Sequence, residues 1–157
     1  MKSTDLEFSE WTPPPRVRGV ALAVVRSGDR FLMQEAFDRA SGSIRYRPIG
    51  GTIEFLEPAA QTVVREFREE LRVELIDVRY LGTIESIGNS VRGPWHEINM
   101  IYRASFADPA NYKVVSFRSV PGSGMRYKTR WLTLSEIEAI PDRIHPPNLR
   151  ILLAETD

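Results

Sequence analysis

The amino-acid sequence predicts an α/β protein in which helices cover the faces of a mixed β-sheet. Short runs rich in valine, isoleucine and tyrosine are separated by turn-forming glycine, proline and asparagine, which is the pattern of strands joined by loops. Two main helical segments, residues 58–71 and 148–155, interleave with these strands, and that order favours a sheet packed between helical layers. We expect one domain over residues 17–157, preceded by a polar lead segment at residues 1–16.

The composition narrows the class of protein. With 42% hydrophobic and 27% charged residues the chain is typical of a soluble globule, and its net charge of zero gives no general attraction to nucleic acid or membrane. The absence of cysteine excludes disulfides and thiolate chemistry, and two histidines argue against an imidazole zinc site. The longest apolar run, residues 20–25, is too short to cross a bilayer, and no signal sequence precedes it, so we expect a cytoplasmic protein.

Three strands are predicted before the central helix. They cover residues 17–25, 30–34 and 44–49. A turn at residues 27–29 makes the first two a hairpin, and a loop at residues 38–43 leads to the third. The third strand runs into Gly50 and Gly51, which allow backbone conformations that are closed to other residues.

The part of the chain after the central helix is predicted to be mostly strand. The strands cover residues 74–86, 97–106, 113–118 and 127–132. A loop at residues 89–94 joins the first two. Ser135 and Glu138 have the spacing of a capping box and predict a short helix, and two consecutive prolines precede the closing helix.

The central helix carries three acids at the margin of its buried face. Its apolar residues recur at helical spacing: Ala60, Val63, Val64, Phe67 and Leu71. Pro58 suits the first helical position, where its missing N–H has no cost. Glu66 and Glu70 lie one turn apart at the edge of the apolar stripe, and Glu69 lies further toward solvent.

These acids have two interpretations. Like charges one turn apart disfavour a helix, whereas a bound cation turns their repulsion into attraction. Hard ions such as Mg²⁺ or Mn²⁺ prefer carboxylate oxygens, so Glu66 and Glu70 are the first-choice metal ligands. The alternative is a solvated acidic face that is balanced by Arg65, Arg68 and Arg72.

The residues before the helix favour the metal site. Five residues separate Gly51 from Glu57, and seven separate Glu57 from Arg65, so the stretch has the form G-x5-E-x7-R-E-F-x-E-E-x-R-V. It resembles the Nudix box, G-x5-E-x7-R-E-U-x-E-E-x-G-U, in which U is a bulky apolar residue. Every defining position matches except Arg72, which stands where the pattern has glycine.

The resemblance implies a Nudix-type α/β/α sandwich with a mixed β-sheet. It also implies hydrolysis of a diphosphate linkage in a nucleoside diphosphate derivative, with Mg²⁺ or Mn²⁺ held by the box glutamates. The candidate metal-binding residues are Glu57, Glu66, Glu69, Glu70 and Gly50, and the candidate catalytic residues are Glu66, Glu69, Glu70, Glu97 and Arg65. The spacing of Glu57 and Glu69 from Arg65 also suits structural ion pairs.

Two positions depart from the usual pattern. At Arg72 a left-handed turn would cost roughly 1 kcal/mol, unless the helix continues through it. Leu56 stands where many members have a second glycine, so the loop that enters the helix is bulkier.

The general base is not identified by the box. Several related enzymes place a glutamate on a later loop, but residues 113–130 contain no acid. Glu97, which begins a strand, is the better candidate from outside the box, and Glu136 is the other. A box glutamate is an equal alternative.

Basic residues on both sides of the box are candidates for substrate binding. Arg45 and Arg47 precede the glycine turn and are expected at the substrate mouth. Arg126 and Lys128 belong to the acid-free segment, which is either a solvated loop or a phosphate-binding one. Asn148 follows two prolines and is similar to the asparagine by which mutator-type members hold a purine base.

Two functions from different classes remain. One is a nucleotide pyrophosphohydrolase, which the intact Glu66, Glu69 and Glu70 favour. The other is a non-catalytic Nudix-fold nucleotide sensor or interaction module, which Arg72 and the acid-free segment favour. The expected partner is a small nucleotide-type substrate, and a homodimer is an open alternative to a monomer.

Overall fold

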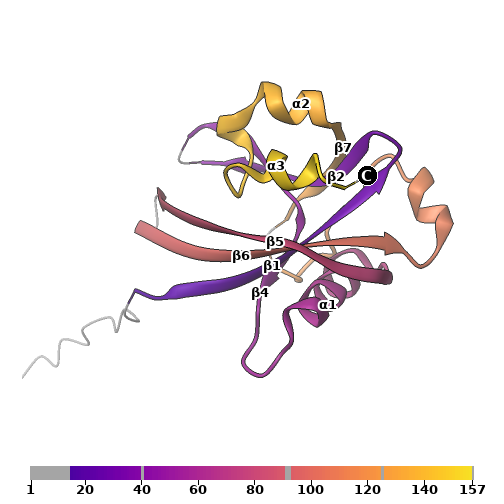
Figure 1. Cartoon of the computed structure of the whole chain (residues 1–157), viewed down its shortest axis with the longest axis horizontal. Helices are drawn as coiled ribbons and strands as arrows, with labels where there is room; N and C mark the ends of the chain where they lie inside the picture. The colour runs from indigo at the N-terminus through magenta and orange to yellow at the C-terminus, as the bar shows by residue number, and fades with distance from the viewer. Residues whose placement is uncertain (1–14, 40, 91–92, 125, 157) are drawn as a thin grey trace, which may run out of the picture.

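The computed structural model describes residues 15–39, 41–90, 93–124 and 126–156. Helix α1 lies on one side of a central group of strands, and helices α2 and α3 lie on the other side (Figure 1). The predicted α/β class, with a mixed sheet between helices, is confirmed. Residues 1–14 of the predicted lead segment lie outside the described residues, so the domain boundary stays a prediction.

The strands and helices alternate as the fold class requires. In chain order the strands are β1 (Val17–Ser27), β2 (Arg30–Asp38), β3 (Ser43–Arg47), β4 (Ile49–Thr52), β5 (Leu75–Ser90), β6 (Gly93–Phe106) and β7 (Lys128–Thr133). The helices are α1 (Ala59–Leu71), α2 (Leu134–Ala139) and α3 (Leu149–Leu153), with 3₁₀ turns η1 (Pro109–Lys113) and η2 (Pro141–Arg143). Among the described residues, none of the helices has the length and apolar character needed to span a membrane.

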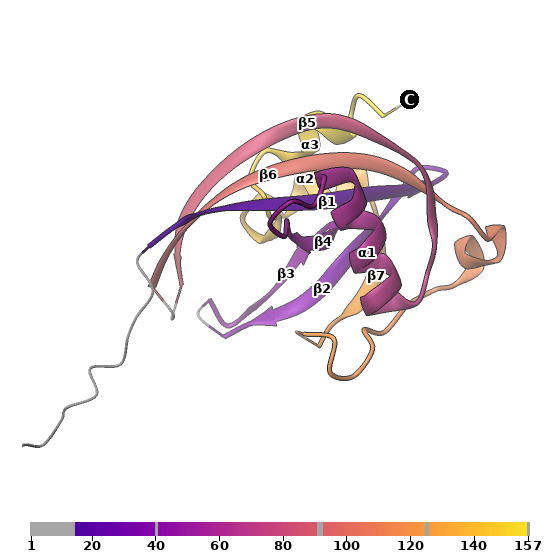
Figure 2. The ribbon, with the colours of Figure 1, turned by 90° about the horizontal axis from the view of Figure 1, so that it is seen from below.

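Strand β1 belongs to two groups of strands. In the first group β1 pairs in parallel with β6 along one edge and antiparallel with β4 along the other edge, and β5 pairs with β6. The second group, β3, β2 and β7, is antiparallel and joins β1 where Arg26 faces Phe31. Figure 2 shows the long curved β5 and β6 arching over β2 and β3. β1 therefore fixes the position of β4, which leads into the box.

The two faces of β1 supply two hydrophobic cores. One set of alternate residues packs on the side of α2 and α3, and its members are Val20, Leu22 and Val24. The other set packs on the side of α1, and its members are Ala21, Ala23 and Val25. Phe67 of α1 is fully buried in this second core, a burial that contributes about 1.5–3 kcal/mol. The apolar stripe of α1 is thus held against the sheet, which fixes the direction of its acidic margin.

Three predicted elements differ from the structure. The strand expected at residues 44–49 is divided into β3 and β4, because Pro48 cannot donate a ladder hydrogen bond. Residues 113–118 form no named strand, and only Arg118 makes a bridge, to Lys128. β5 and β6 extend into the loop predicted at residues 89–94, of which residues 91–92 lie outside the described chain.

The starts of two helices also differ from the prediction. Pro58 is the N-cap of α1, with an extended backbone, and not its first helical residue. The capping box of helix α2 lies two residues earlier than predicted, since Thr133 and Glu136 form it in place of Ser135 and Glu138. The same spacing occurs at both pairs, and the earlier pair keeps Leu134 inside the helix.

The two departures from the box pattern are both left-handed residues. Arg72 has φ 56° and ψ 38°, and its N–H donates to the carbonyl of Arg68 at 3.1 Å. The N–H of Val73 donates to the carbonyl of Phe67 at 3.2 Å, and the bond from Arg72 to Arg68 is that of the αL motif, so the helix ends in a left-handed cap. Leu56 has φ 64° and its side chain is almost fully exposed. The glycine-type turns are therefore kept without glycine, at a cost of roughly 1 kcal/mol each.

Replacing Arg72 by glycine is expected to raise the free energy of unfolding by roughly 0.5–1 kcal/mol, because glycine adopts this conformation without side-chain strain. The gain is smaller than the strain, since glycine is also more flexible in the unfolded chain. Urea denaturation measures it. Arg68→Gly, inside the last turn of α1, is the control and should lose about 1 kcal/mol. A lower midpoint for R72G would show that the Arg72 side chain makes compensating contacts.

Candidate active site

The carboxylate of Glu66 packs directly against the backbone of β4 at Gly51. A Cβ atom on Gly51 would collide with Glu66 Oε1, and a Cβ on Gly50 would collide with the carbonyl oxygen of Ala21. Neither glycine has a left-handed backbone, so both are required for close approach and not for an unusual φ as predicted. The Glu66 side chain, about one-eighth exposed, is therefore held between the helix and the strand.

Arg65 connects the loop before the helix to the acids on it. Its guanidinium donates to both carboxylate oxygens of Glu57, at 2.6 and 3.0 Å. It also donates to Glu66 at 3.1 Å and to Glu69 at 3.2 Å, and to the carbonyl of Thr52 at 3.2 Å. One side chain thus fixes three carboxylates and the end of β4.

The contact with Arg65 keeps Glu57 ionised. The guanidinium lowers the pKa of Glu57 to about 2, and a hydrogen bond from Thr62 assists it. The predicted spacing of Glu57 and Glu69 from Arg65 therefore produces the structural ion pairs that were one of the two alternatives. Glu69 remains more than half exposed.

Glu70 is held by a residue from the far end of the acid-free segment. The hydroxyl of Tyr127 donates to Glu70 Oε2 at 2.6 Å. Burial raises the pKa of Glu70 to about 7; the Tyr127 hydrogen bond opposes this, and the charge of Glu66 adds to it. Both first-choice metal ligands therefore have a fixed partner, since Arg65 holds Glu66 and Tyr127 holds Glu70.

Arg47 of β3 is a buried cation with unused hydrogen-bonding capacity. Its Nε atom has no partner among the described residues, and its terminal nitrogen reaches Gln34 and the carbonyl of Gly50 only at 3.4 Å. Burial lowers the pKa of Arg47, and the charges of Glu97 and Glu70 oppose that shift. Arg47 therefore lies within electrostatic reach of both carboxylates, and an anion there would complete its hydrogen bonds.

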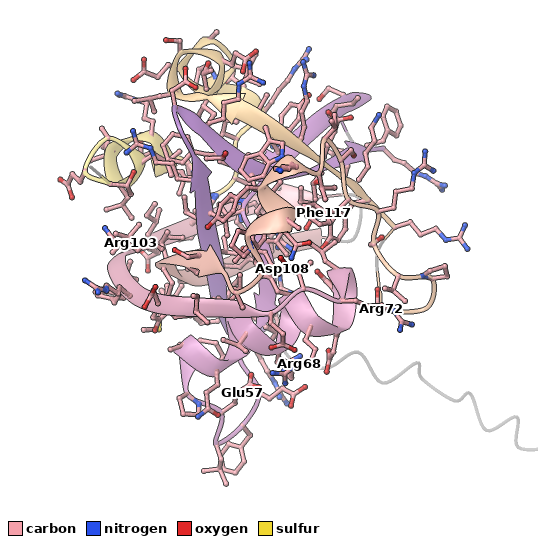
Figure 3. All side chains as sticks on the ribbon, turned by 90° about the vertical axis from the view of Figure 1, so that its right-hand side faces the viewer. Glu57, Arg68, Arg72, Arg103, Asp108 and Phe117 are labelled. Atoms are coloured by element: carbon pink, nitrogen blue, oxygen red, sulfur yellow. The ribbon has the colours of Figure 1, made fainter. Side chains whose placement is uncertain are left out.

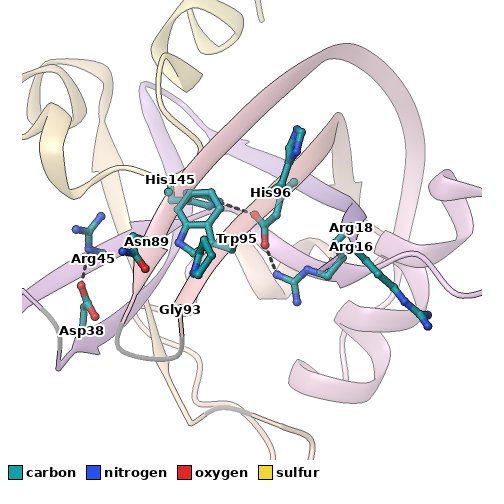
Figure 4. A pocket seen from close by; sticks show the side chains of 12 residues that line it. Arg16, Arg18, Asp38, Arg45, Asn89, Gly93, Trp95, His96 and His145 are labelled. Atoms are coloured by element: carbon teal, nitrogen blue, oxygen red, sulfur yellow. Dashed lines mark hydrogen bonds and ion pairs between the residues drawn. The ribbon is translucent and has the colours of Figure 1, made fainter. Parts of the chain in front are cut away.

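Glu97 of β6 lies at one side of a cleft of about 700 Å³ (Figure 4). It accepts hydrogen bonds from Arg18 and, at 2.9 Å, from His145 Nε2. Burial opposes ionisation, but these two donors lower the pKa of Glu97 to about 2. Trp95 meets the ring of His145 edge-on, with 5.1 Å between centroids. The cleft thus combines an aromatic corner with a fixed carboxylate.

The remaining predicted substrate residues lie in different places. Arg45 forms an ion pair with Asp38 at 2.9 Å and lines the cleft of Glu97. Arg126 and Lys128 line a second cleft, beside Tyr127. Asn148 is the exposed N-cap of α3 and lines neither cleft. The structure therefore places Arg45 in the cleft of Glu97, Arg47 within electrostatic reach of Glu97 and Glu70, and Arg126 and Lys128 in the second cleft.

The carboxylates fit a divalent cation as a pair and not as a triad. Within the described segments, no three acidic or histidine side chains converge on one point that could hold a metal. Glu66 and Glu70 present carboxylate oxygens one turn apart on α1, and burial together with the charge of Glu66 raises the pKa of Glu70. Gly51 leaves the space that the Glu66 carboxylate occupies. These features suit a hard ion such as Mg²⁺.

The chain matches the NUDIX domain over residues 15–153 and belongs to this family. Proteins with this domain are typically pyrophosphohydrolases that depend on a divalent metal. No curated protein matches the chain.

Solved structures support the assignment of the fold. A MutT NUDIX hydrolase from Burkholderia pseudomallei has a TM-score of 0.66 and 22% identity, over 90% of this chain and 99% of that chain. A NUDIX hydrolase from Nitrosomonas europaea has a TM-score of 0.65 and 15% identity, over 89% and 88%. A MutT protein from Methanosarcina mazei Go1 has a TM-score of 0.64 and 13% identity, over 92% and 95%. At these identities the likeness is one of fold alone.

Three residues of the site were not predicted from the sequence. Tyr127 was assigned only to a strand, and Arg18 and His145 were not assigned to the site at all. Each joins its carboxylate from 48 or more positions away in the chain. The alternation of Tyr127, Thr129 and Trp131 along one strand face was the one available hint that Tyr127 points inward.

Replacing Glu97 by glutamine is expected to lower stability at neutral pH by about 2 kcal/mol. The pKa of Glu97 is depressed from 4.5 to about 2, so its contribution is fully present above pH 4.5 and is lost as the pH falls toward 2. The denaturation midpoints of wild type and E97Q should therefore approach each other as the pH falls from about 4.5 toward about 2.

The matched control is Glu85→Gln, because Glu85 also pairs with a histidine, His96, but is mostly exposed. E85Q should differ little from wild type at either pH. A loss in E97Q that stays constant down to pH 3, or an equal loss in E85Q, would contradict the interpretation.

Proposed function

We propose that the protein hydrolyses a diphosphate linkage in a nucleoside diphosphate derivative and depends on Mg²⁺ or Mn²⁺. The observation that carries this proposal is the carboxylate pair at the end of α1. Glu66 is fixed against the backbone of Gly51, and Glu70 has a pKa of about 7 because it is buried. A helix with only a structural role has no need of two acids that repel each other at this spacing.

Glu66 and Glu70 would hold the cation, with the carbonyl oxygen of Gly50 as a further ligand of the same type. A bound cation would neutralise charge on the diphosphate and lower the pKa of the attacking water. Arg65 keeps Glu66 and Glu69 in place, and Tyr127 keeps Glu70 in place.

Arg47 is the proposed contact for the diphosphate itself. It is the buried guanidinium whose Nε lacks a partner among the described residues, and it lies within reach of the charge of Glu70. A phosphate oxygen would supply the missing acceptor through a charge-assisted hydrogen bond. The adjoining cleft of Glu97 and Trp95 would take the part of the substrate that is not phosphate.

We propose that a box carboxylate accepts the proton of the attacking water and that Glu97 has a positioning role. Both oxygens of Glu97 already accept hydrogen bonds, from Arg18 and from His145. A carboxylate with a pKa of about 2 is a weak base at neutral pH. Glu97 would instead orient Arg18 and His145 at the side of the cleft.

Glu66→Gln and Glu70→Gln should each lower turnover by about 100-fold or more, because each removes a negatively charged ligand of the cation. Nucleotide sugars, dinucleoside polyphosphates and nucleoside triphosphates, each with Mg²⁺ and Mn²⁺, form the substrate panel. Glu138→Gln, an exposed change on α2, is the control and should keep full turnover. Circular dichroism checks that the variants fold.

Full activity in E70Q, or in the presence of excess chelator, would contradict the proposed chemistry. If wild type binds one member of the panel tightly and hydrolyses none, the nucleotide-sensor function takes its place.

A further inference from the structure

A second hollow, of about 670 Å³, opens at the C-terminal end of α1. Its lining includes four cationic side chains and no acid: Arg72, Arg118, Arg126 and Lys128. Figure 3 labels Arg72 at the C-terminal end of α1. We call this hollow, defined by its four cations, the basic cleft.

Most of the charge in the basic cleft is not compensated. Lys128 shares Glu35, whose carboxylate lies 3.3 Å away. Arg72, Arg118 and Arg126 are exposed, and within the described parts of the chain no carboxylate forms an ion pair with them. Three guanidinium groups facing one hollow repel one another, so an anion that enters is attracted by all of them.

The basic cleft adjoins the carboxylate pair. Tyr127 lines the cleft, and its hydroxyl donates to Glu70 Oε2 at 2.6 Å. Val120 also lines it, and its N–H donates to the carbonyl of Glu70 at 2.7 Å. A ligand at Glu70 therefore has the basic cleft next to it, through Tyr127 and Val120.

We propose that the basic cleft binds a chain of phosphates that extends beyond the linkage to be cleaved. Resting on the proposed function, this makes a nucleoside triphosphate or dinucleoside polyphosphate the preferred substrate over a nucleotide sugar. Arginine and lysine form strong charge-assisted hydrogen bonds to phosphate, and guanidinium can do so through two N–H groups at once. The distal sugar of a nucleotide sugar is uncharged and would leave three guanidinium groups without partners.

Binding of inorganic tripolyphosphate to the full chain, without added metal, tests the cleft by itself. Calorimetry should show an affinity that falls by about 10-fold or more in Arg118→Gln/Arg126→Gln, since each lost contact is to a charged group. The control is Arg79→Gln/Arg103→Gln, which removes the same charge from facing positions of β5 and β6. Arg103 lies well apart from Arg72 in Figure 3. The control variant should bind like wild type, and equal affinity in all three proteins would overturn the proposal.

R72G separates a structural role of Arg72 from a binding one. This variant should be more stable than wild type and yet bind tripolyphosphate several-fold more weakly, because it loses strain and a cation together. Unchanged tripolyphosphate affinity in R72G would show that Arg72 does not contribute to binding in the basic cleft.

Kinetics then distinguish phosphates of the substrate from a separate anion. In R118Q/R126Q, KM for a dinucleoside tetraphosphate should rise about 10-fold with kcat little changed, while KM for a nucleotide sugar stays constant. Equal increases for both, or no increase for either, would overturn the substrate assignment, and in the latter case the cleft takes a separate anion. If wild type hydrolyses neither compound but its tripolyphosphate binding depends on Arg118 and Arg126, the proposed hydrolase function is contradicted, whereas phosphate binding by the basic cleft is supported.

Discussion

The close approach of helix α1 to strand β4 is the constraint on which the site depends. Only a glycine at position 51 leaves room for the Glu66 carboxylate, and only a glycine at position 50 leaves room for the carbonyl of Ala21. The buried middle of β1, residues 20–25, sets the position of β4, and the apolar stripe of α1 sets the position of the helix. The carboxylates are therefore positioned by packing on both sides, and Arg65 ties them to the loop between strand and helix.

Around this constraint the charges divide into three zones. Arg65 neutralises the acids at the start of the helix, so Glu57 stays ionised. Glu70, one turn beyond Glu66, is partly buried, and its pKa is raised by burial and by the charge of Glu66. Tyr127 joins Glu70 to the basic cleft, where the described carboxylates do not fully compensate the cations. Carboxylates that suit a cation thus adjoin cations that suit phosphates.

The sequence was informative where the determinants are local. The spacing from Gly51 to Val73 correctly predicted the amphipathic helix and the family, and it offered the pairing of Arg65 with Glu57 and Glu69 as one of two alternatives. It failed where a contact joins distant segments, as for Tyr127 on Glu70 and His145 on Glu97, because tertiary packing and not spacing decides these pairs. It also misassigned the cap of α2, since two pairs of residues had the same local spacing and only packing selects one.

The Gly51→Ala variant tests whether the close approach of α1 to β4 positions the Glu66 carboxylate for metal binding. The added Cβ would collide with the end of the flexible Glu66 side chain, so the carboxylate can move away at little cost in stability, whereas Gly50→Ala would collide with the backbone of β1 and destabilise the fold. G51A should keep a denaturation midpoint near that of wild type. Its affinity for Mn²⁺, measured by electron paramagnetic resonance, should fall by about 10-fold or more. Wild-type Mn²⁺ affinity in folded G51A would contradict this prediction.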